Sequence, residues 1–167
     1  MRLGNAALAG VAIAALATAG TVSAATASSA ASPATAQSKT LIFSVHFSQF
    51  EALHLNPNSD PTTGFGFGDE LTFYDLLFSH GTQAGDEGGS CVVVNASQPL
   101  ANCTEVIRLQ QGTITAEGLS GPPPTKHPAL TGGTGIYRTA GGEATLMEFS
   151  STRGKLMLHL LGFSPGR

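Results

Sequence analysis

The chain has 167 residues, of which 11% are charged and 41% are hydrophobic, and it contains 21 Gly and 9 Pro. This composition argues against a disordered protein and against a charged, helix-rich bundle, and it favours strands and turns in a single domain. Because 11 acidic residues outnumber 8 Lys and Arg, the net charge is −3. We therefore expect no nucleic-acid partner and no binding to an anionic membrane.

Residues 1–24 are predicted to be a secretory signal peptide. Met1-Arg2 gives a positive end, an apolar, alanine-rich run follows over 6–22, and small residues lead to a cleavage site after Ala24. A second small-residue match ends at Ala36. A membrane span is the alternative, but the run is marginal in length and no basic cluster follows it. We expect a secreted protein with no stable membrane insertion after cleavage.

A leader and one folded domain are expected after the signal peptide. Residues 25–39 are almost wholly Ala, Ser, Thr, Pro and Gln, which is typical of a disordered segment. Folding is expected to start near Thr40, so residues 40–167 form the domain. Residues 40–55 alternate apolar and polar side chains, which predicts a long first strand, and residues 56–68 have the composition of a loop.

Seven further segments complete the predicted strand set. The second strand starts at Asp69, and the glycine-rich cluster His80–Gly89 is predicted to be a turn. The remaining strands are expected over residues 90–96, 103–111, 113–119, 127–131, 136–151 and 155–163. Eight strands are the number at which an antiparallel sheet closes around an interior that side chains fill or that holds one small ligand. We therefore predict an all-β, eight-stranded antiparallel barrel, with an open two-sheet sandwich as the alternative.

The two cysteines fit an exported protein. Cys91 and Cys103 lie at the starts of adjacent predicted strands, and an oxidising compartment favours their pairing. The pairing stays open at this point, because the turn predicted over residues 97–102 could leave the two residues too far apart. No metal site is expected, since the five His are scattered and no Cys-x-x-Cys or His-x-His spacing occurs.

Three segments in a fixed order resemble the allene oxide cyclase barrel family, which is related to the plant dirigent proteins and has a calycin-like barrel. They are GDELTFYDLLF followed by AGDEGGSC, then QQGTITAEG, and finally ALTGGTGIYRTAGGEATL. The resemblance spans about Leu41 to Phe163. Gly132, Gly133 and Gly135 of the last segment are best interpreted as positions that need positive φ or a close backbone approach.

The resemblance implies a function as well as a fold. It implies a barrel, commonly trimeric, that binds a lipophilic small molecule and cyclises it without a cofactor, as an isomerase does. Alternatively, the barrel guides the stereochemistry of a reaction without catalysing it, as dirigent proteins do, or its interior is filled and its role is structural. Near the end of the first strand, His46 stands where the cyclases place a catalytic Glu, and we take it as a candidate catalytic residue. The other interpretation is a strand His that a neighbour satisfies.

Further site candidates come from the residues themselves. Asp75 shares its strand parity with Leu71, Phe73 and Leu77, an arrangement that raises a carboxyl pKa, and it is the second catalytic candidate. Asp69 is the third, although it could instead cap backbone N–H groups at the rim. The candidates for ligand binding share an aromatic or charged side chain on a predicted strand. They are Phe43, Phe73, Tyr74, Tyr137, Arg138 and Glu117.

Some of the ligand-binding candidates also fit a role outside the cavity, and a separate segment predicts self-association. Glu117 lies in a short polar strand and could be a solvated acid on the outer face. Tyr74 and Tyr137 are the only tyrosines, and the rim of an amphipathic barrel would suit them equally well. Residues 155–161 are apolar on both faces apart from His159, which predicts a strand that contacts a neighbouring subunit in a homo-oligomer.

Overall fold

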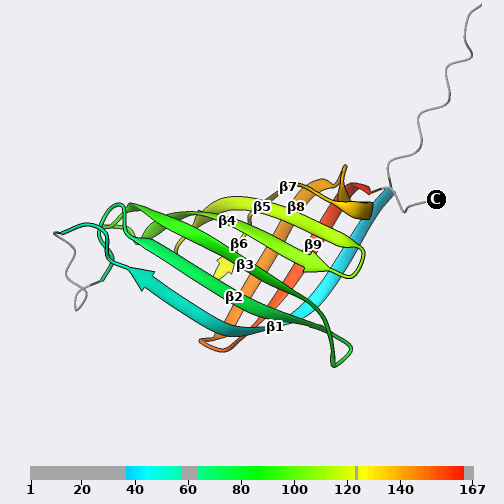
Figure 1. Ribbon diagram of the computed structural model, residues 1–167, viewed down its shortest axis with the longest axis horizontal. Coiled ribbons are helices and arrows are strands. Elements are labelled where there is room, and N and C mark those ends of the chain that lie inside the picture. Colours follow the sequence, from blue (N-terminus) through cyan, green and yellow to red (C-terminus); the bar gives the residue numbers. More distant parts are fainter. Residues whose placement is uncertain (1–36, 58–63, 123, 164–167) are drawn as a thin grey trace, which may run out of the picture. The chain divides into compact units, whose positions relative to one another are not determined.

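The computed structural model describes residues 37–57, 64–122 and 124–163 (Figure 1). The predicted signal peptide, and the predicted leader up to residue 36, lie outside the described residues. The first strand begins at Gln37, three residues before the predicted start of the fold. The elements are β1 (Gln37–Leu53), β2 (Glu70–Ser79), β3 (Thr82–Asn95), β4 (Leu100–Leu109), β5 (Gly112–Ser120), β6 (Thr125–Lys126), β7 (Ala129–Gly133), the short 3₁₀ helix η1 (Gly135–Tyr137), β8 (Gly141–Ser150) and β9 (Arg153–Phe163).

The strands form one closed antiparallel barrel (Figure 1). Consecutive strands pair from β1 to β5, then β5 pairs with β7 and β7 with β8. The barrel closes because β9 pairs with both β8 and β1. The two-residue strand β6 pairs with β8 beside this ring. The predicted eight-stranded barrel is therefore confirmed, and the alternative of an open sandwich is wrong.

Buried apolar and exposed side chains alternate along the strands, and the apolar face of each strand points into the barrel. In β9 the leucines at positions 156, 158 and 160 are buried, whereas His159 is exposed. In β1 Phe43 and Val45 are buried and Ser44 between them is exposed. Successive side chains of a strand point to opposite faces, so each apolar set meets inside the barrel. This is the pattern that the sequence predicted.

The turn predicted over His80–Gly89 is confirmed only for its first two residues, and its extent is wrong. The chain turns at two residues, His80 with φ 51° and Gly81 with φ 80°, and β3 begins directly afterwards at Thr82. Two residues with positive φ are typical of a tight hairpin turn, which matches the twist of the flanking strands. The other glycines of the cluster belong to β3. At Gly85, for example, a Cβ atom would clash with the carbonyl oxygen of Arg108.

The predicted strand over residues 136–151 starts later than expected, at Gly141, because the chain first forms η1. Gly132 and Gly135 of the preceding segment have φ of 148° and 59°, and a Cβ atom on Gly133 would meet the carbonyl of Thr113. The backbone roles predicted for these three glycines are therefore confirmed. The tight path places Tyr137, which is 4% exposed, in the core.

The core fills one part of the barrel interior. It joins the buried inward side chains of seven strands and the residues around η1, which pack as one cluster. The cluster consists of Phe43, Val45, Leu77, Ile107, Ile114, Ala116, Leu130, Tyr137, Ala140, Ala144, Leu156, Leu158 and Leu160. On β1 and β4 the inward positions beyond this cluster, from Phe47 and from Glu105 outward, line a cavity instead.

Candidate functional site

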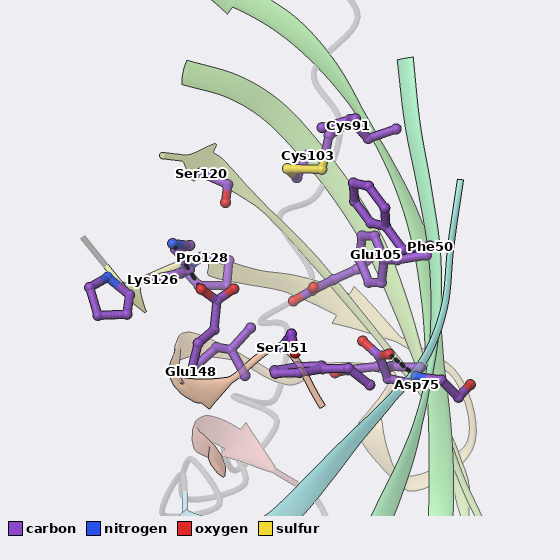
Figure 2. Close-up of a pocket in the computed structure, with 18 of the residues that line it drawn as sticks. Phe50, Asp75, Cys91, Cys103, Glu105, Ser120, Lys126, Pro128, Glu148 and Ser151 are labelled. Carbon is purple, nitrogen blue, oxygen red and sulfur yellow. Dashed lines mark hydrogen bonds and ion pairs between the residues drawn. A yellow bond between two sulfur atoms is a disulfide. The ribbon is translucent and has the colours of Figure 1, made fainter. Parts of the chain in front are cut away.

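A cavity of about 980 Å³ occupies the barrel beyond the core cluster (Figure 2). Its apolar wall includes Phe47, Leu71, Phe73 and Leu146. Phe50 and Phe149 also line it, and each is 66% exposed, which places them at its mouth. A cavity of this size with apolar walls and a few polar groups is typical of a small-molecule site.

Three acidic side chains from neighbouring strands line this cavity next to the core. Asp75 of β2 lies opposite Glu87 of β3 in the strand register, and Glu87 lies opposite Ile107 of β4. Glu105 is two positions before Ile107, so it faces the same side of the sheet. All three line the cavity, and Glu87 is 2% exposed. We call Asp75, Glu87 and Glu105 the acid floor.

Burial raises the pKa of every member of the acid floor. It raises the pKa of Asp75 from 3.8 to about 6, against the opposing effect of a backbone hydrogen bond. It raises the pKa of Glu105 from 4.5 to about 7, with a further contribution from the negative charge of Asp75. The pKa of Glu87 is raised well above 4.5, by burial and then by the charges of Glu105 and Asp75. The floor carboxyls therefore keep their protons to a higher pH than exposed carboxyl groups do.

A bulge in β1 sets the position of Asp75. The register of β1 against β2 shifts between Phe47 and Gln49, which leaves Ser48 as an extra residue. The backbone N–H of Ser48 donates to Asp75 Oδ1 at 3.1 Å, and its hydroxyl donates to the carbonyl of Tyr74 at 2.7 Å. A hydrogen bond to the ionised form favours that form, which accounts for the more moderate pKa of this carboxyl.

The facing wall carries an ion pair. Lys126 Nζ lies 3.4 Å from Glu148 Oε2 and donates to the carbonyl oxygen of Gly121 at 2.7 Å. In Figure 2 Lys126 and Glu148 lie across the cavity from Asp75 and Glu105. The charge of Glu148 contributes to the raised pKa of Asp75. The ammonium group is thus already partnered on its own side of the cavity.

A glycine of β3 makes room for an aromatic side chain of the cavity wall. Gly89 follows Glu87 by two positions in β3 and lies opposite Glu105. A Cβ atom at Gly89 would lie 2.8 Å from Phe73 Cζ and would also meet the carbonyl oxygen of Thr104. The missing side chain therefore lets the ring of Phe73 pack between the strands.

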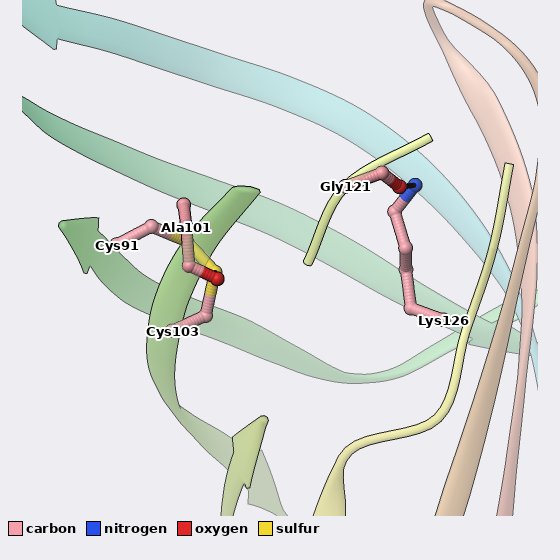
Figure 3. Close-up of a disulfide and its surroundings, with 5 residues drawn as sticks. All are labelled: Cys91, Ala101, Cys103, Gly121 and Lys126. Atoms are coloured by element: carbon pink, nitrogen blue, oxygen red, sulfur yellow. Dashed lines mark hydrogen bonds between the residues drawn. A yellow bond between two sulfur atoms is a disulfide. The ribbon is translucent and has the colours of Figure 1, made fainter. Parts of the chain in front are cut away.

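The disulfide between Cys91 and Cys103 is present and lines the cavity (Figure 3). The two residues are direct register partners of β3 and β4, with Cα atoms 4.0 Å apart. The predicted pairing is confirmed. The distance is short because β3 continues to Asn95 and β4 begins at Leu100, so both cysteines lie about equally far from the connection.

His46 lies outside the residues that line the cavity. Its Nε2 atom is 2.7 Å from Arg153 Nη1, and its ring centroid is 4.3 Å from that of Phe78. It follows the buried Val45 in β1, so it points to the opposite face of the sheet. This position agrees with the alternative interpretation, a strand His with neighbouring partners, and gives a catalytic role no support.

Asp69 is fully buried and organises a loop. Its carboxylate accepts hydrogen bonds from the backbone N–H groups of Gly66 at 2.7 Å and Asn56 at 3.0 Å, and it pairs with His54 Nδ1 at 3.1 Å. It is not among the cavity-lining residues. The geometry is that of the capping role considered as the alternative for this residue.

The structure separates the predicted ligand-binding residues. Phe73 lines the cavity, whereas Phe43 and Tyr137 belong to the core cluster. Tyr74, Arg138 and Glu117 are also absent from the cavity lining, and the latter two are exposed. Tyr74 lies beside an outward-facing ion pair in which Arg108 Nη2 is 2.6 Å from Asp86 Oδ2.

Sequence reasoning missed Glu87 and Glu105. Glu105 carries the same signal that identified Asp75, since it alternates with Cys103 and Ile107 on one face of a strand. Glu87 carried no such signal, because its segment was interpreted as a turn.

The described part of the chain contains neither a cluster of metal ligands nor a membrane-spanning helix. Within residues 37–57, 64–122 and 124–163, no three His, Cys, Asp or Glu side chains are grouped as a metal site would require. No helix among these same residues is long and apolar enough to cross a membrane.

Comparisons with solved structures agree with the geometry. A protein described as pyocyanin demethylase is 30% identical, with a TM-score of 0.65 over 73% of this chain and 99% of its own. A pterocarpan synthase dirigent protein is 16% identical, with a TM-score of 0.64 over 78% of this chain and 93% of its own. An exo-specific intermolecular Diels-Alderase is 17% identical, with a TM-score of 0.61 over 75% and 99%. No match was found among curated protein sequences.

A family model described as the allene oxide cyclase barrel like domain matches residues 52–157. That span runs from the end of β1 into β9 and includes every residue of the acid floor and both cysteines. The predicted resemblance is thus confirmed, and the chain belongs to the allene oxide cyclase barrel-like family.

Proposed function

We propose that the cavity binds an apolar small molecule and promotes its rearrangement, a cyclisation or related isomerisation, without a bound cofactor. The observation that carries this proposal is the acid floor beneath apolar walls. The carboxyl groups of Asp75 and Glu105 have pKa values of about 6 and about 7. General acid–base catalysis is most effective when the pKa of the catalytic group lies near the working pH.

The shape of the site supports this chemistry in a second way. Phe47, Leu71, Phe73 and Leu146 surround the floor with apolar surface. Such walls hold a flexible ligand in one geometry, which removes much of the entropic barrier to ring closure. They also exclude water, so a proton transferred from a floor carboxyl to the ligand has few competing acceptors.

The relatives guide the choice of substrates to test. The pyocyanin demethylase is similar enough in sequence for its likeness to extend beyond the fold, so pyocyanin is one test substrate. The dirigent protein and the Diels-Alderase are less than 25% identical, and their likeness concerns the fold alone. A fatty-acid allene oxide, the substrate class implied by the family resemblance, is the other test substrate.

A saturation experiment tests ligand binding directly. The chain contains no Trp, so Leu146→Trp fills the cavity and introduces a single tryptophan reporter at the same time. The neutral apolar dye N-phenylnaphthylamine is expected to bind the purified protein saturably and to lose binding in this variant. Leu53→Trp, at an exposed leucine of β1 outside the cavity lining, is the matched control and should bind normally. Absence of saturable binding to the unaltered protein would contradict the proposal.

A second experiment separates catalysis from binding alone. Asp75→Asn should slow conversion of an accepted substrate while dye binding persists, because the amide cannot supply a proton. His46→Ala, which lies outside the cavity lining, should convert substrate normally. If the protein binds the dye saturably but converts neither test substrate, the stereochemical-guidance alternative is favoured. Loss of activity in His46→Ala alone would place the chemistry outside this cavity.

Export and self-association complete the proposed function. The disulfide supports an oxidising compartment, and therefore the predicted secretion after cleavage at Ala24.

On the outer face, Leu161 of β9 and Ile42 of β1 are 59% and 53% exposed, which supports the predicted subunit contact along β9. Sedimentation equilibrium of the purified protein should give a homo-oligomer, with a trimer expected, and a monomer at all concentrations would contradict this.

A further inference from the structure

Glu87 has an unmet hydrogen-bonding requirement at the base of the cavity. The residue is 2% exposed, and its Oε2 atom is buried with no hydrogen-bond partner in the described part of the chain. A buried polar atom without a partner destabilises a protein, so such atoms are uncommon in folded proteins. Because Glu87 lines the cavity, a bound ligand is in a position to supply the missing donor.

The charges that face Glu87 are mostly of its own sign. Asp75 approaches from β2 and Glu105 from β4, and Glu148 lies on the facing wall. Among the described residues that line the cavity, Lys126 is the one cation, and it pairs with Glu148 and Gly121. The floor thus has an excess of carboxyl groups over cations.

We propose that the ligand of this cavity carries a basic nitrogen, whose protonated form donates a hydrogen bond to Glu87 and lies between Asp75 and Glu105. The inference rests on the proposed function, since it names the class of apolar ligand that the cavity accepts. A cation supplies the donor that Glu87 Oε2 lacks, and its positive charge compensates the floor carboxyls that ionise when it binds. Hydrogen bonds between ionised partners are about twice as strong as neutral ones.

Every proton is accounted for, whether the ligand enters the cavity as a neutral base or already protonated. If the ligand enters as a neutral base, a floor carboxyl transfers its proton to the nitrogen, leaving a carboxylate and an ammonium ion in contact. If the ligand enters already protonated, the floor releases a proton to solvent as its carboxyl ionises. The Oε2 atom is covered in the empty cavity, so the Glu87 side chain changes rotamer when the nitrogen donates to it.

Matched probes test this inference. The flat cation proflavine and the neutral tricycle anthracene have similar shapes, and anthracene carboxylate supplies the opposite charge. Proflavine should bind about tenfold or more tightly than anthracene at pH 7.5, and anthracene carboxylate should bind more weakly than both. The affinity for proflavine should rise from pH 5.5 to pH 7.5, because the floor carboxyls ionise in this range, whereas the affinity for anthracene should stay constant.

Conservative variants locate the recognition. Glu87→Gln should weaken proflavine binding about tenfold and leave anthracene binding within about twofold, since only the charge is removed. Glu105→Gln is a second variant with the same expected pattern. Glu117→Gln is the matched control, because this exposed Glu of β5 lies outside the cavity lining, and it should change neither affinity.

The outcomes separate the inference from the proposed function. If anthracene binds saturably but proflavine binds no more tightly, the basic-nitrogen inference is overturned and the apolar cavity stands. If Glu87→Gln weakens both probes equally, charge recognition by this residue is overturned as well. If neither probe binds, the inference and the proposed function both fail.

Discussion

Raising the pH through neutrality should destabilise this protein, because its acid floor keeps protons in the folded state. The folded-state pKa of Glu105 is about 7, whereas its ordinary value is 4.5. Between these values the folded state binds more protons than the unfolded state. The stabilisation is thus fully present below about pH 4.5, declines as the pH rises, and is lost once the pH passes about 7.

The size of the effect follows from the difference in pKa. Integrating proton binding for Glu105 between pH 5 and pH 8 gives a loss of about 2 to 3 kcal/mol in the free energy of unfolding. Asp75 acts in the same direction, with a smaller contribution because its folded-state pKa of about 6 lies closer to pH 5. Glu87 adds to the same trend, since its pKa is also raised.

Urea unfolding followed by far-ultraviolet circular dichroism at several pH values measures this effect. The free energy of unfolding should fall from pH 5 to pH 8, and Glu105→Gln should reduce that fall by about 2 kcal/mol. Glu117→Gln, on the outer face, should keep the full pH dependence. Stability that stays level or rises from pH 5 to pH 8, or a variant Glu105→Gln with the same slope as the original protein, would refute the reasoning.

Three further changes have expected effects on stability. Reduction of the disulfide between Cys91 and Cys103, which are 12 positions apart, should lower the free energy of unfolding by about 3 kcal/mol. Urea unfolding with and without reductant measures this difference. Unchanged stability after complete reduction to free thiols would contradict the prediction. Leu158→Ala should lower the free energy of unfolding by about 2–5 kcal/mol, because the residue is 0% exposed. Leu161→Ala, at a residue that is 59% exposed, should lower it by less than about 1 kcal/mol. Equal losses in the two variants would contradict the assignment of Leu158 to the barrel interior. Gly142→Ala should lower the melting temperature, because Gly142 has φ 131° and its missing Cβ faces a neighbouring carbonyl; an unchanged melting temperature would show that this backbone position tolerates a side chain.

The sequence was sufficient for the barrel because most of its strands alternate apolar and polar residues. It failed at β3, where Gly85 and Gly89 are needed for close approach to neighbouring strands rather than for a turn. A turn and a glycine-rich strand can have the same composition of glycine and acidic residues. Only the pairing with neighbouring strands distinguishes the two. The register of the two cysteines was uncertain for the same reason, since it depended on where β3 ends.

The candidate site was predictable where strand parity applied. Asp75 was identified because it alternates with apolar residues, and the structure places it in the cavity. The family resemblance indicates His46, but this residue follows the buried Val45 in β1 and therefore faces outward. The capping role of Asp69 was among the sequence-based interpretations, whereas Glu87 depends on contacts between neighbouring strands, which no local pattern reveals.

The protonation of the acid floor is the central claim, and carbon NMR of the glutamate and aspartate side-chain carboxyls tests it most directly. In the empty protein, Glu105 is expected to titrate near pH 7 and Asp75 near pH 6, and the pKa of Glu87 is expected well above its ordinary value of 4.5. The signals would be assigned with Glu87→Gln, Glu105→Gln and Asp75→Asn. Titration of all three carboxyls close to their ordinary values would contradict the account.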